Sequence, residues 1–564
     1  MINKNLKIQN WHDLEVFFDE LQNRTLQSVA DLELLIQNYS DVMSVFAENY
    51  GWAFIHMTCD TANAEKKQTY ETLAGQVYPL VKKAQEALHQ KILTSPHAQN
   101  LNAERYGLLL KKFKNAIQIF SPKNVDLEAE LAPLESRYRQ IVGGLTANIK
   151  GEEITLQQAA LHLNSSDRAE RQMAWEAMQS SRMSVKSELD TLFDAMLKLR
   201  HQIALNSGFA NYRDFKHQEK ERFDYTPKDC LAFHESVKLY VVPLLNKISQ
   251  RRQIALSLVV NDYKPWDTDA TPIGIEPLKP FSTADELLTK GLQVFEKLDS
   301  SLAQNLVKMR EYKLFDLESR KGKAPGGYNC YLDITGMPFI FMNAAGDQRE
   351  VVTLMHECGH ATHNFLSNHD SLQFYRDFPT EMAETASMSM ELMTMPYWQD
   401  YYANPKDHIR AQIEQLEGIV TRLPWIALVD KFQHWIYLNP QHTSSERNAH
   451  FSELLNEFGP QNINWQGFEA EHQNIWQKQL HIFEIPFYYI EYGISQIGAL
   501  QVYKNFKKDQ KWALESYKSG LKLGGTKPLP ELWKTMNIQF DFSAETIREL
   551  MIFVEQELEQ LYAL

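Results

Sequence analysis

The five-residue motif His-Glu-Cys-Gly-His at residues 356–360 constrains this chain more than any other stretch. Residues four apart lie on one face of an α-helix, so helical folding would direct both imidazoles toward one metal ion. Two histidines at this spacing, with a glutamate directly after the first, are typical of zinc peptidases, in which the glutamate takes a proton from water. We therefore expect a helix over residues 351–366 in which His356 and His360 bind zinc and Glu357 is the general base.

The flanking sequence also favours a helix here. Asp347 is a favourable N-cap residue, and Glu350, three residues later, completes the pattern of a capping box. No proline occurs from residue 347 to residue 366, and Gly359 is the only residue in the helix interior that weakens a helix. The sequence therefore predicts a helix that starts directly after Asp347.

Composition narrows the class of protein. With 564 residues the chain is long enough for two large lobes. A net charge of −14 argues against a nucleic-acid partner, and no run of about 18 uncharged apolar residues indicates a membrane segment. The four cysteines are scattered without a Cys-x-x-Cys pair, and residues 1–20 lack the apolar core of a signal peptide. We therefore expect a cytoplasmic protein, and the oligomeric state stays open.

Most of the chain has the periodicity of amphipathic helices. Residues 1–170 are interpreted as an N-terminal helical region that forms part of one lobe, and residues 171–564 as the catalytic region with the zinc site. One apolar stripe illustrates the pattern, with members three or four residues apart: Leu32, Leu35, Ile36, Tyr39, Val42, Met43 and Phe46. The sequence thus predicts a mainly α fold whose first part supplies walls rather than chemistry.

Extended structure is predicted only between residues 312 and 346. A turn at residues 324–328 is followed by a β-prone run at residues 338–343, directly before the zinc helix. Such a strand could pair its backbone with an extended peptide, or it could be a buried strand of a small sheet. Under the first interpretation we expect Gly327, Ile340 and Met342 to contact substrate.

A catalytic zinc ion needs a third protein ligand. His363 shares the helix face but lies about 10 Å of helical rise from His356, so one straight helix cannot bring it to the same ion. We expect it to support the site or to lie in the core. After Pro379, Glu381, Glu384 and Glu391 lie on one side of a second predicted helix, and spacing alone does not choose among them.

The residues in both predicted helices resemble the thimet oligopeptidase/oligoendopeptidase F family of zinc metallopeptidases. That family has the pattern His-Glu-x-Gly-His-x-x-His, matched by residues 356–363, and a later glutamate in an Ala/Val-Glu-x-x-Ser context, matched by residues 383–387. The resemblance implies that Glu384 is the third ligand. It also implies that Glu391, two helical turns later, orients a ligand histidine.

An aromatic segment near residue 490 is the other unusual feature. Taken alone, tyrosines beside an apolar helix are more often core residues with satisfied hydroxyls. The resemblance implies a different function, because family members place a histidine followed by tyrosines near the zinc. On this basis His481 and Tyr492 would stabilise the oxyanion, and Tyr488 and Tyr489 would contact substrate.

These observations predict a zinc-dependent oligoendopeptidase that hydrolyses internal bonds of short unstructured peptides, with one zinc ion per chain. The resemblance implies a two-lobed helical fold with a deep central channel and a small β-sheet beside the zinc helix. Two alternatives stay open. One is an exopeptidase of related fold that releases dipeptides or single residues, and the other is a non-catalytic helical peptide-binding protein.

Overall fold

Helix α15 (Gln348–Ser367) carries the histidine motif. The Asp347 side chain accepts a hydrogen bond from the backbone N–H of Glu350, and the Glu350 carboxylate accepts one from the N–H of Asp347. This reciprocal pair satisfies donors that have no partner inside the helix. The predicted helix and its capping box are confirmed.

The computed structural model describes residues 2–272 and 274–564, so Met1 and Ile273 lie outside the described part. Contacts divide the chain into two units, each built from three segments. Unit 1 comprises Met1–Gln118, Leu278–Gln412 and Ser495–Phe540, and unit 2 comprises Ile119–Pro277, Ile413–Ile494 and Asp541–Leu564. Within the described part, no helix combines the length and the low polarity that crossing a membrane requires.

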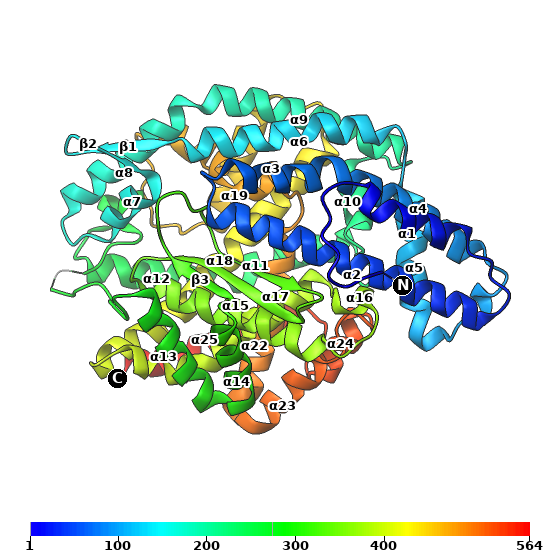
Figure 1. Cartoon of the computed structure of the whole chain (residues 1–564). Helices are drawn as coiled ribbons and strands as arrows, with labels where there is room; N and C mark the ends of the chain where they lie inside the picture. Colours follow the sequence, from blue (N-terminus) through cyan, green and yellow to red (C-terminus); the bar gives the residue numbers. More distant parts are fainter. Residues whose placement is uncertain (1, 273) are drawn as a thin grey trace. The chain divides into compact units, whose positions relative to one another are not determined.

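Helices make up most of both units (Figure 1). Those of unit 1 are α1 (His12–Asn23), α2 (Val29–Cys59), α3 (Ala64–Thr72), α4 (Tyr78–Thr94), α5 (Ala103–Ile119), α13 (Ala284–Leu298), α14 (Ser300–Glu311), α15, α16 (Gln373–Arg376), α17 (Thr380–Thr394), α23 (Gln510–Leu521) and α24 (Leu529–Thr535). Those of unit 2 are α6 (Asn124–Gly143), α7 (Leu156–Leu161), α8 (Arg168–Ser184), α9 (Lys186–Asn206), α10 (Tyr212–Glu219), α11 (Pro227–Tyr240), α12 (Val242–Ala255), α19 (Ser444–Phe458), α20 (Glu469–Asn474), α21 (Leu480–Glu484) and α25 (Ala544–Tyr562). Helices α18 (Pro405–Leu438) and α22 (Tyr489–Lys508) contribute residues to both units, and so does α5, whose last residue belongs to unit 2.

The predicted apolar stripe of residues 32–46 lies on α2, and all seven of its side chains are buried. The mainly helical fold is therefore confirmed. The predicted division of the chain at residue 170, which lies in α8, stays a prediction.

Helices α15 and α17 pack closely at one glycine. A Cβ atom at Gly359 would lie 2.6 Å from the Cα of Ser387 and 3.0 Å from the carbonyl oxygen of Ala386. Real side chains do not tolerate such distances, so the absence of a side chain lets the two backbones approach. The residue that weakens the helix locally is thus the one that brings the second helix near.

A three-stranded sheet lies beside α15 within unit 1, as predicted (Figure 1). The central strand β5 (Met337–Ala344) pairs in parallel with β3 (Phe315–Glu318) and antiparallel with β4 (Tyr328–Leu332). Strand β4 is therefore an edge strand, whereas β5 has a neighbour on each side.

The prediction that residues 338–343 pair with a peptide is wrong. Strand β5 already has partners on both sides, and the side chains of Ile340 and Met342 are 0% and 1% exposed. Ile340 and Met342 are therefore core residues rather than substrate contacts. The alternative of a buried strand in a small sheet is the one that the structure has.

A short hairpin in unit 2 lies outside the region predicted to be extended. Strand β1 (Thr146–Ile149) pairs antiparallel with β2 (Glu152–Thr155). The two residues between them, Lys150 and Gly151, have φ values of 55° and 90°. Two positive φ values are typical of a tight hairpin turn, but Lys-Gly lacks the usual Asn-Gly or Asp-Gly signal, so the sequence pattern did not predict it.

Candidate active site

Three side chains of the predicted metal site meet between α15 and α17, and we call them the α15–α17 group. His356 and His360 lie one turn apart on α15, and Glu384 lies on α17. The Oε2 atom of Glu384 lies 3.3 Å from His356 Nε2 and 3.8 Å from His360 Nε2. Donor atoms of all three residues lie within 4.8 Å of one another. Of the glutamates that spacing left open, Glu384 is the one in this group.

The donor set fits a catalytic zinc ion. A tetrahedral ion with ligands at about 2.0–2.1 Å holds neighbouring ligand atoms about 3.3 Å apart, close to the distance between His356 and Glu384. The side chains of His356 and His360 are 21% and 17% exposed, so the group reaches solvent. Two neutral imidazoles and one carboxylate would leave a divalent ion with net positive charge, which a Lewis acid needs.

The pKa values of the two histidines agree with a cation at this position. Burial lowers the pKa of His360 to about 4 and so favours the neutral imidazole that binds metal. Burial acts the same way on His356, but hydrogen bonds to Glu384 and Glu391 outweigh it and raise its pKa well above the usual value. Carboxylates that favour positive charge on this ring would equally favour a metal ion beside it.

Two further side chains hold the ligands in place. Glu391 Oε1 accepts a hydrogen bond from His356 Nδ1 at 2.7 Å, which leaves Nε2 facing Glu384. The hydroxyl of Ser387 lies 3.2 Å from Glu384 Oε2 and donates to that carboxylate. Both contacts come from α17, so one helix carries a ligand and the groups that orient ligands.

Glu357 lies directly after His356 and is buried. Its Oε2 atom has no hydrogen-bond partner among the described residues. A Cβ atom at Gly327 would lie 3.7 Å from its Oε1 atom, so the backbone just before β4 passes close to this carboxyl group. Burial raises the pKa of Glu357 to about 7, a value suited to gaining and losing a proton near neutral pH.

His363 is a core residue. It is fully buried and stacks on Phe378 with ring centroids 3.4 Å apart. Neither ring nitrogen has a hydrogen-bond partner among the described residues, and burial lowers its pKa well below the usual value. Of the two positions expected for His363, the core is the one that the structure has.

Four residues of the predicted aromatic segment form a group within unit 2. The ring centroid of His481 lies 5.8 Å from that of Tyr488, 4.7 Å from that of Tyr489 and 6.0 Å from that of Tyr492. All four side chains are half-buried, and the Nε2 atom of Gln479 donates to His481 Nδ1 at 2.8 Å. The residues expected to act together are therefore neighbours. Their action at the metal site stays a prediction.

A buried arginine positions the short helix α21 that carries His481. Arg200 donates to the carbonyl oxygen of Ile482 at 3.2 Å and to that of Phe483. It also donates to the hydroxyl of Tyr437 at 3.0 Å. A five-residue helix has no stable hydrogen-bond ladder of its own, so these contacts define where its carbonyl groups lie.

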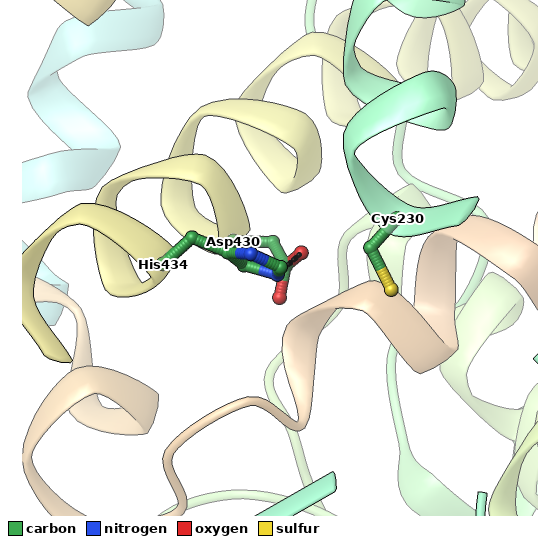
Figure 2. Close-up of side chains that lie close together, drawn as sticks. All are labelled: Cys230, Asp430 and His434. Carbon is green, nitrogen blue, oxygen red and sulfur yellow. Dashed lines mark ion pairs between the residues drawn. The ribbon is translucent and has the colours of Figure 1, made fainter. Parts of the chain in front are cut away.

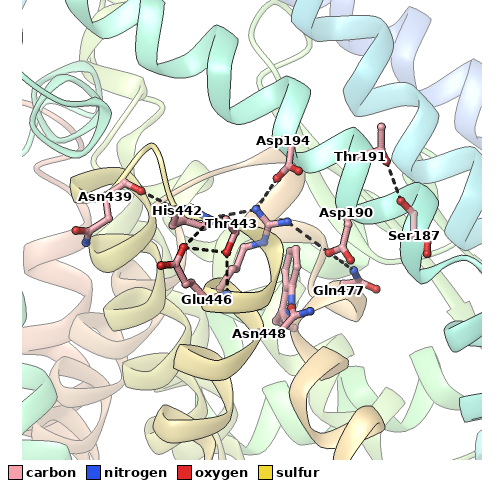
Figure 3. A network of polar contacts seen from close by, with 12 residues as sticks. Ser187, Asp190, Thr191, Asp194, Asn439, His442, Thr443, Glu446, Asn448 and Gln477 are labelled. Carbon is pink, nitrogen blue, oxygen red and sulfur yellow. Dashed lines mark hydrogen bonds and ion pairs between the residues drawn. The ribbon is translucent and has the colours of Figure 1, made fainter.

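A second buried arginine anchors the segment before α21. Arg447 lies 2.7 Å from Asp194 and 3.4 Å from Asp190, both on α9. Gln477 donates to the same Asp190 at 2.9 Å. Figure 3 shows these aspartates facing the helix that follows His442, with Gln477 beside them. The network connects α9, α19 and the residues that lead into His481.

Two positively charged side chains that lie beside the tyrosines were not predicted from the sequence. Arg222 donates to the carbonyl oxygen of Phe487, which has a φ of 64°, and lies 2.8 Å from Glu491 Oε1. Lys220 lies 3.1 Å from Glu491 and 4.7 Å from the ring centroid of Tyr488. Arg222 precedes Phe487 by 265 residues, so no local sequence pattern could have connected them.

Comparisons with known proteins agree with this description. Residues 161–552 match the model of Peptidase family M3, and residues 4–120 match that of the Peptidase M3 N-terminal domain. The Oligoendopeptidase F homolog of Borreliella burgdorferi is 22% identical, over 91% of this chain and 89% of that protein. Solved structures described as PZ peptidase A with an inhibitor and as an oligoendopeptidase F are 26% and 28% identical. Each has a TM-score of 0.91 and covers 98% of both chains.

Proposed function

Because this chain belongs to peptidase family M3, we propose that it is a zinc-dependent oligoendopeptidase that hydrolyses internal bonds of short unstructured peptides. Family membership makes the chain a metallopeptidase, and the oligoendopeptidase F descriptions of its relatives support oligopeptide substrates. The observation that carries the proposal is the α15–α17 group with the buried Glu357 beside it.

In this proposal His356, His360 and Glu384 hold one zinc ion. Bound there, zinc supplies a Lewis acid that lowers the pKa of water toward about 7 and polarises a carbonyl oxygen. Glu391 keeps the His356 ring in one orientation through Nδ1, and Ser387 does the same for the Glu384 carboxylate. Both contacts support a rigid ligand set.

Glu357 is the general base. As a carboxylate it takes a proton from the attacking water, and it then passes a proton to the leaving amine. Its raised pKa supports both steps, because the carboxyl group must accept and release a proton at similar pH. Its Oε2 atom has no partner among the described residues that would compete with water for it.

His481 and Tyr492 are proposed to donate hydrogen bonds to the oxyanion that forms as water attacks the peptide carbonyl. Tyr488 and Tyr489 are proposed to contact the substrate. Their proximity to one another supports a shared function.

We assign recognition of the peptide backbone to β4 instead of β5. An edge strand has unpaired backbone groups that an extended peptide can meet, and β4 is such a strand. Gly327 directly precedes it, and the backbone there lies near Glu357. The restriction to short peptides follows from the enclosed channel that the family resemblance implies, because a folded protein cannot enter one.

The cytoplasm is the compartment that we propose. None of the four cysteines forms a disulfide, as expected in a reducing environment. The net charge of −14 supports substrates other than nucleic acids.

Mass spectrometry of products from unstructured peptides of graded length, together with one folded protein, tests this function. We expect internal cuts in the short peptides only. Substitution Glu357→Gln should lower kcat/KM by at least about 10²-fold, because it removes the general base, and a chelator should abolish cleavage. Zinc content of the variant should stay unchanged.

Glu296→Gln is the matched control, since Glu296 is exposed on α13 and the same substitution there should leave cleavage unchanged. Stepwise loss of residues from the C-terminus would indicate the exopeptidase alternative instead. Binding of peptides without any cleavage would indicate a binding protein. Cleavage that survives Glu357→Gln would contradict the mechanism.

A further inference from the structure

A second group of metal-binding side chains lies within unit 2, and we call it the α11–α18 group. Cys230, Asp430 and His434 are buried, and donor atoms of the three lie within 4.8 Å of one another. Figure 2 shows Asp430 and His434 leaving α18 and Cys230 leaving α11, all directed into the same space. Across the described residues, this group and the α15–α17 group are the two that meet this criterion.

Each helix contributes two polar side chains one turn apart. Cys230 and His234 lie four residues apart on α11, and Asp430 and His434 have the same spacing on α18. Side chains at this spacing share a helix face, so two metal-binding faces are turned toward each other. His234 and Asp430, which touch across the two helices, are 196 residues apart in sequence.

Asp430 makes contacts of different length with the two histidines. Its Oδ2 atom lies 3.3 Å from His434 Nε2, which matches the separation of about 3.3 Å between neighbouring ligands of a tetrahedral zinc ion. The same Oδ2 lies 2.8 Å from His234 Nε2, which is the length of a hydrogen bond. His234 is thus placed to orient the carboxylate, as outer hydrogen-bond partners of metal ligands commonly do.

The contacts among these side chains leave one carboxylate oxygen of the group without a hydrogen-bond partner among the described residues. The Oδ1 atom of Asp430 is buried and has no hydrogen-bond partner among the described residues. A buried acceptor without a partner costs about 1–3 kcal/mol, and native structures rarely leave one without a reason. A cation bound by both oxygens of the carboxylate would satisfy Oδ1 as well as Oδ2, so the unpartnered Oδ1 atom is a second observation that points to a ligand.

Charge and ligand type indicate which cation fits. A Cys230 thiolate and the Asp430 carboxylate together carry two negative charges, which one divalent ion neutralises inside the protein. A sulfur, a nitrogen and an oxygen donor suit zinc, whereas calcium and magnesium prefer oxygen ligands alone. The three side chains supply three of the four ligands that a tetrahedral zinc ion takes, and their burial matches structural zinc sites, which are closed to solvent.

We propose that Cys230, Asp430 and His434 bind a second zinc ion, with His234 holding the Asp430 carboxylate in place. The ion ties α11 to α18 within unit 2. Its role is structural, because its ligands are buried and the loaded group is neutral. This inference does not depend on the function of the α15–α17 group.

Cobalt(II) substitution distinguishes the two metal sites. A thiolate ligand on cobalt gives a charge-transfer absorption in the near ultraviolet, which imidazole and carboxylate ligands do not give. The full-length protein, prepared with cobalt in place of zinc, is expected to bind two ions per chain and to show this absorption. Cys230→Ser is expected to remove the absorption and one of the two ions.

Cys59→Ser is the matched control, because it removes another thiol and should change neither the absorption nor the metal content. Glu384→Ala should lose the other ion and keep the absorption, so failure at one site is distinguishable from failure at the other. The number of ions and the absorption of the wild-type protein test the proposal even if a variant does not fold. One ion per chain without thiolate absorption would overturn the proposal.

Discussion

The α15–α17 group and the α11–α18 group share a local design and differ in chemistry. Each lies between two helices and includes two donors one turn apart on a single helix. The first combines two imidazoles with a carboxylate and reaches solvent, whereas the second includes a thiol and is buried. On a divalent ion the first donor set leaves positive charge and the second leaves none. The charge of the ligands and their exposure to solvent therefore distinguish a reactive metal site from a structural one. The spacing of the donors along a helix is the same in both.

The helices of the two pairs also approach each other in different ways. Helices α15 and α17 touch backbone to backbone at Gly359. In unit 2 a glycine on α22 packs against both helices of the pair: a Cβ at Gly493 would lie 2.8 Å from the Phe233 ring and 3.1 Å from Ile426. Each group thus depends on one position where a side chain has no room, but only in the first does that position lie between the two helices that supply the ligands.

The largest expected effect is a loss of protein stability after a substitution in the α11–α18 group. Asp430→Asn removes the charge that faces His234 and His434 in a buried cluster, and breaking a buried pair costs about 3–5 kcal/mol. We expect the free energy of unfolding in urea to fall by that amount, while the folded fraction still cleaves peptides. Asp407→Asn, in a half-buried surface pair on the same helix, should cost under about 1 kcal/mol. Equal losses in the two variants would contradict the distinction between them.

A smaller effect tests the close contact that builds the α15–α17 group. Gly359→Ala forces α17 away from α15, and overpacking of this kind costs about 1–3 kcal/mol. We expect weaker zinc binding at this group, measured by competition with a chelator, and an unchanged thiolate absorption from the α11–α18 group. Gly107→Ala, in α5 with nothing within 4 Å of the added atom, should instead be neutral or slightly stabilising. Unchanged zinc affinity in Gly359→Ala would show that the contact does not set the ligand geometry.

The smallest effect concerns the residue that orients a ligand. Glu391→Gln keeps an acceptor near His356 Nδ1 but removes its charge. Loss of such a partner commonly lowers metal affinity about 10–100-fold, so the zinc dissociation constant should rise within that range while the fold persists. Glu296→Gln, the same substitution at an exposed position on α13, gives the reference zinc affinity. A zinc affinity equal to this reference would mean that the carboxylate only fills space.

Local sequence was enough to predict the helical part of the candidate site. Asp347 and Glu350 predict where α15 starts, and the spacing of His356 and His360 predicts that they share a face. These properties depend on residues within a few positions of one another, so they are present in the sequence before any tertiary contact forms. The association of Glu391 with a ligand histidine was implied by the family resemblance and not by local sequence, and it corresponds to a contact in the structure.

Strand pairing could not be predicted in the same way. Residues 338–343 are β-prone, but only the position of β3 and β4 on either side makes β5 a central strand. A sequence records the preference of a strand and not the number of its neighbours. The substrate contacts expected for Ile340 and Met342 failed for that reason.

The α11–α18 group was missed although each half has a visible pattern. Cys230 with His234, and Asp430 with His434, are pairs four residues apart, which is the spacing that identified the histidine motif. Each pair alone is common on helices, and a thiol-histidine pair and an acid-histidine pair nearly 200 residues apart do not predict one another.

The sequence by itself determined the helices, their caps and the faces that carry metal-binding side chains, because those depend on 3.6-residue periodicity and on hydrogen bonds between close neighbours. The tertiary structure alone decided which faces meet. Glu384 joins the histidines of α15 because Gly359 admits α17, and Asp430 meets His234 because α18 packs against α11. Packing joins residues that are distant in sequence, and no local preference specifies which of many apolar helix faces will be buried together.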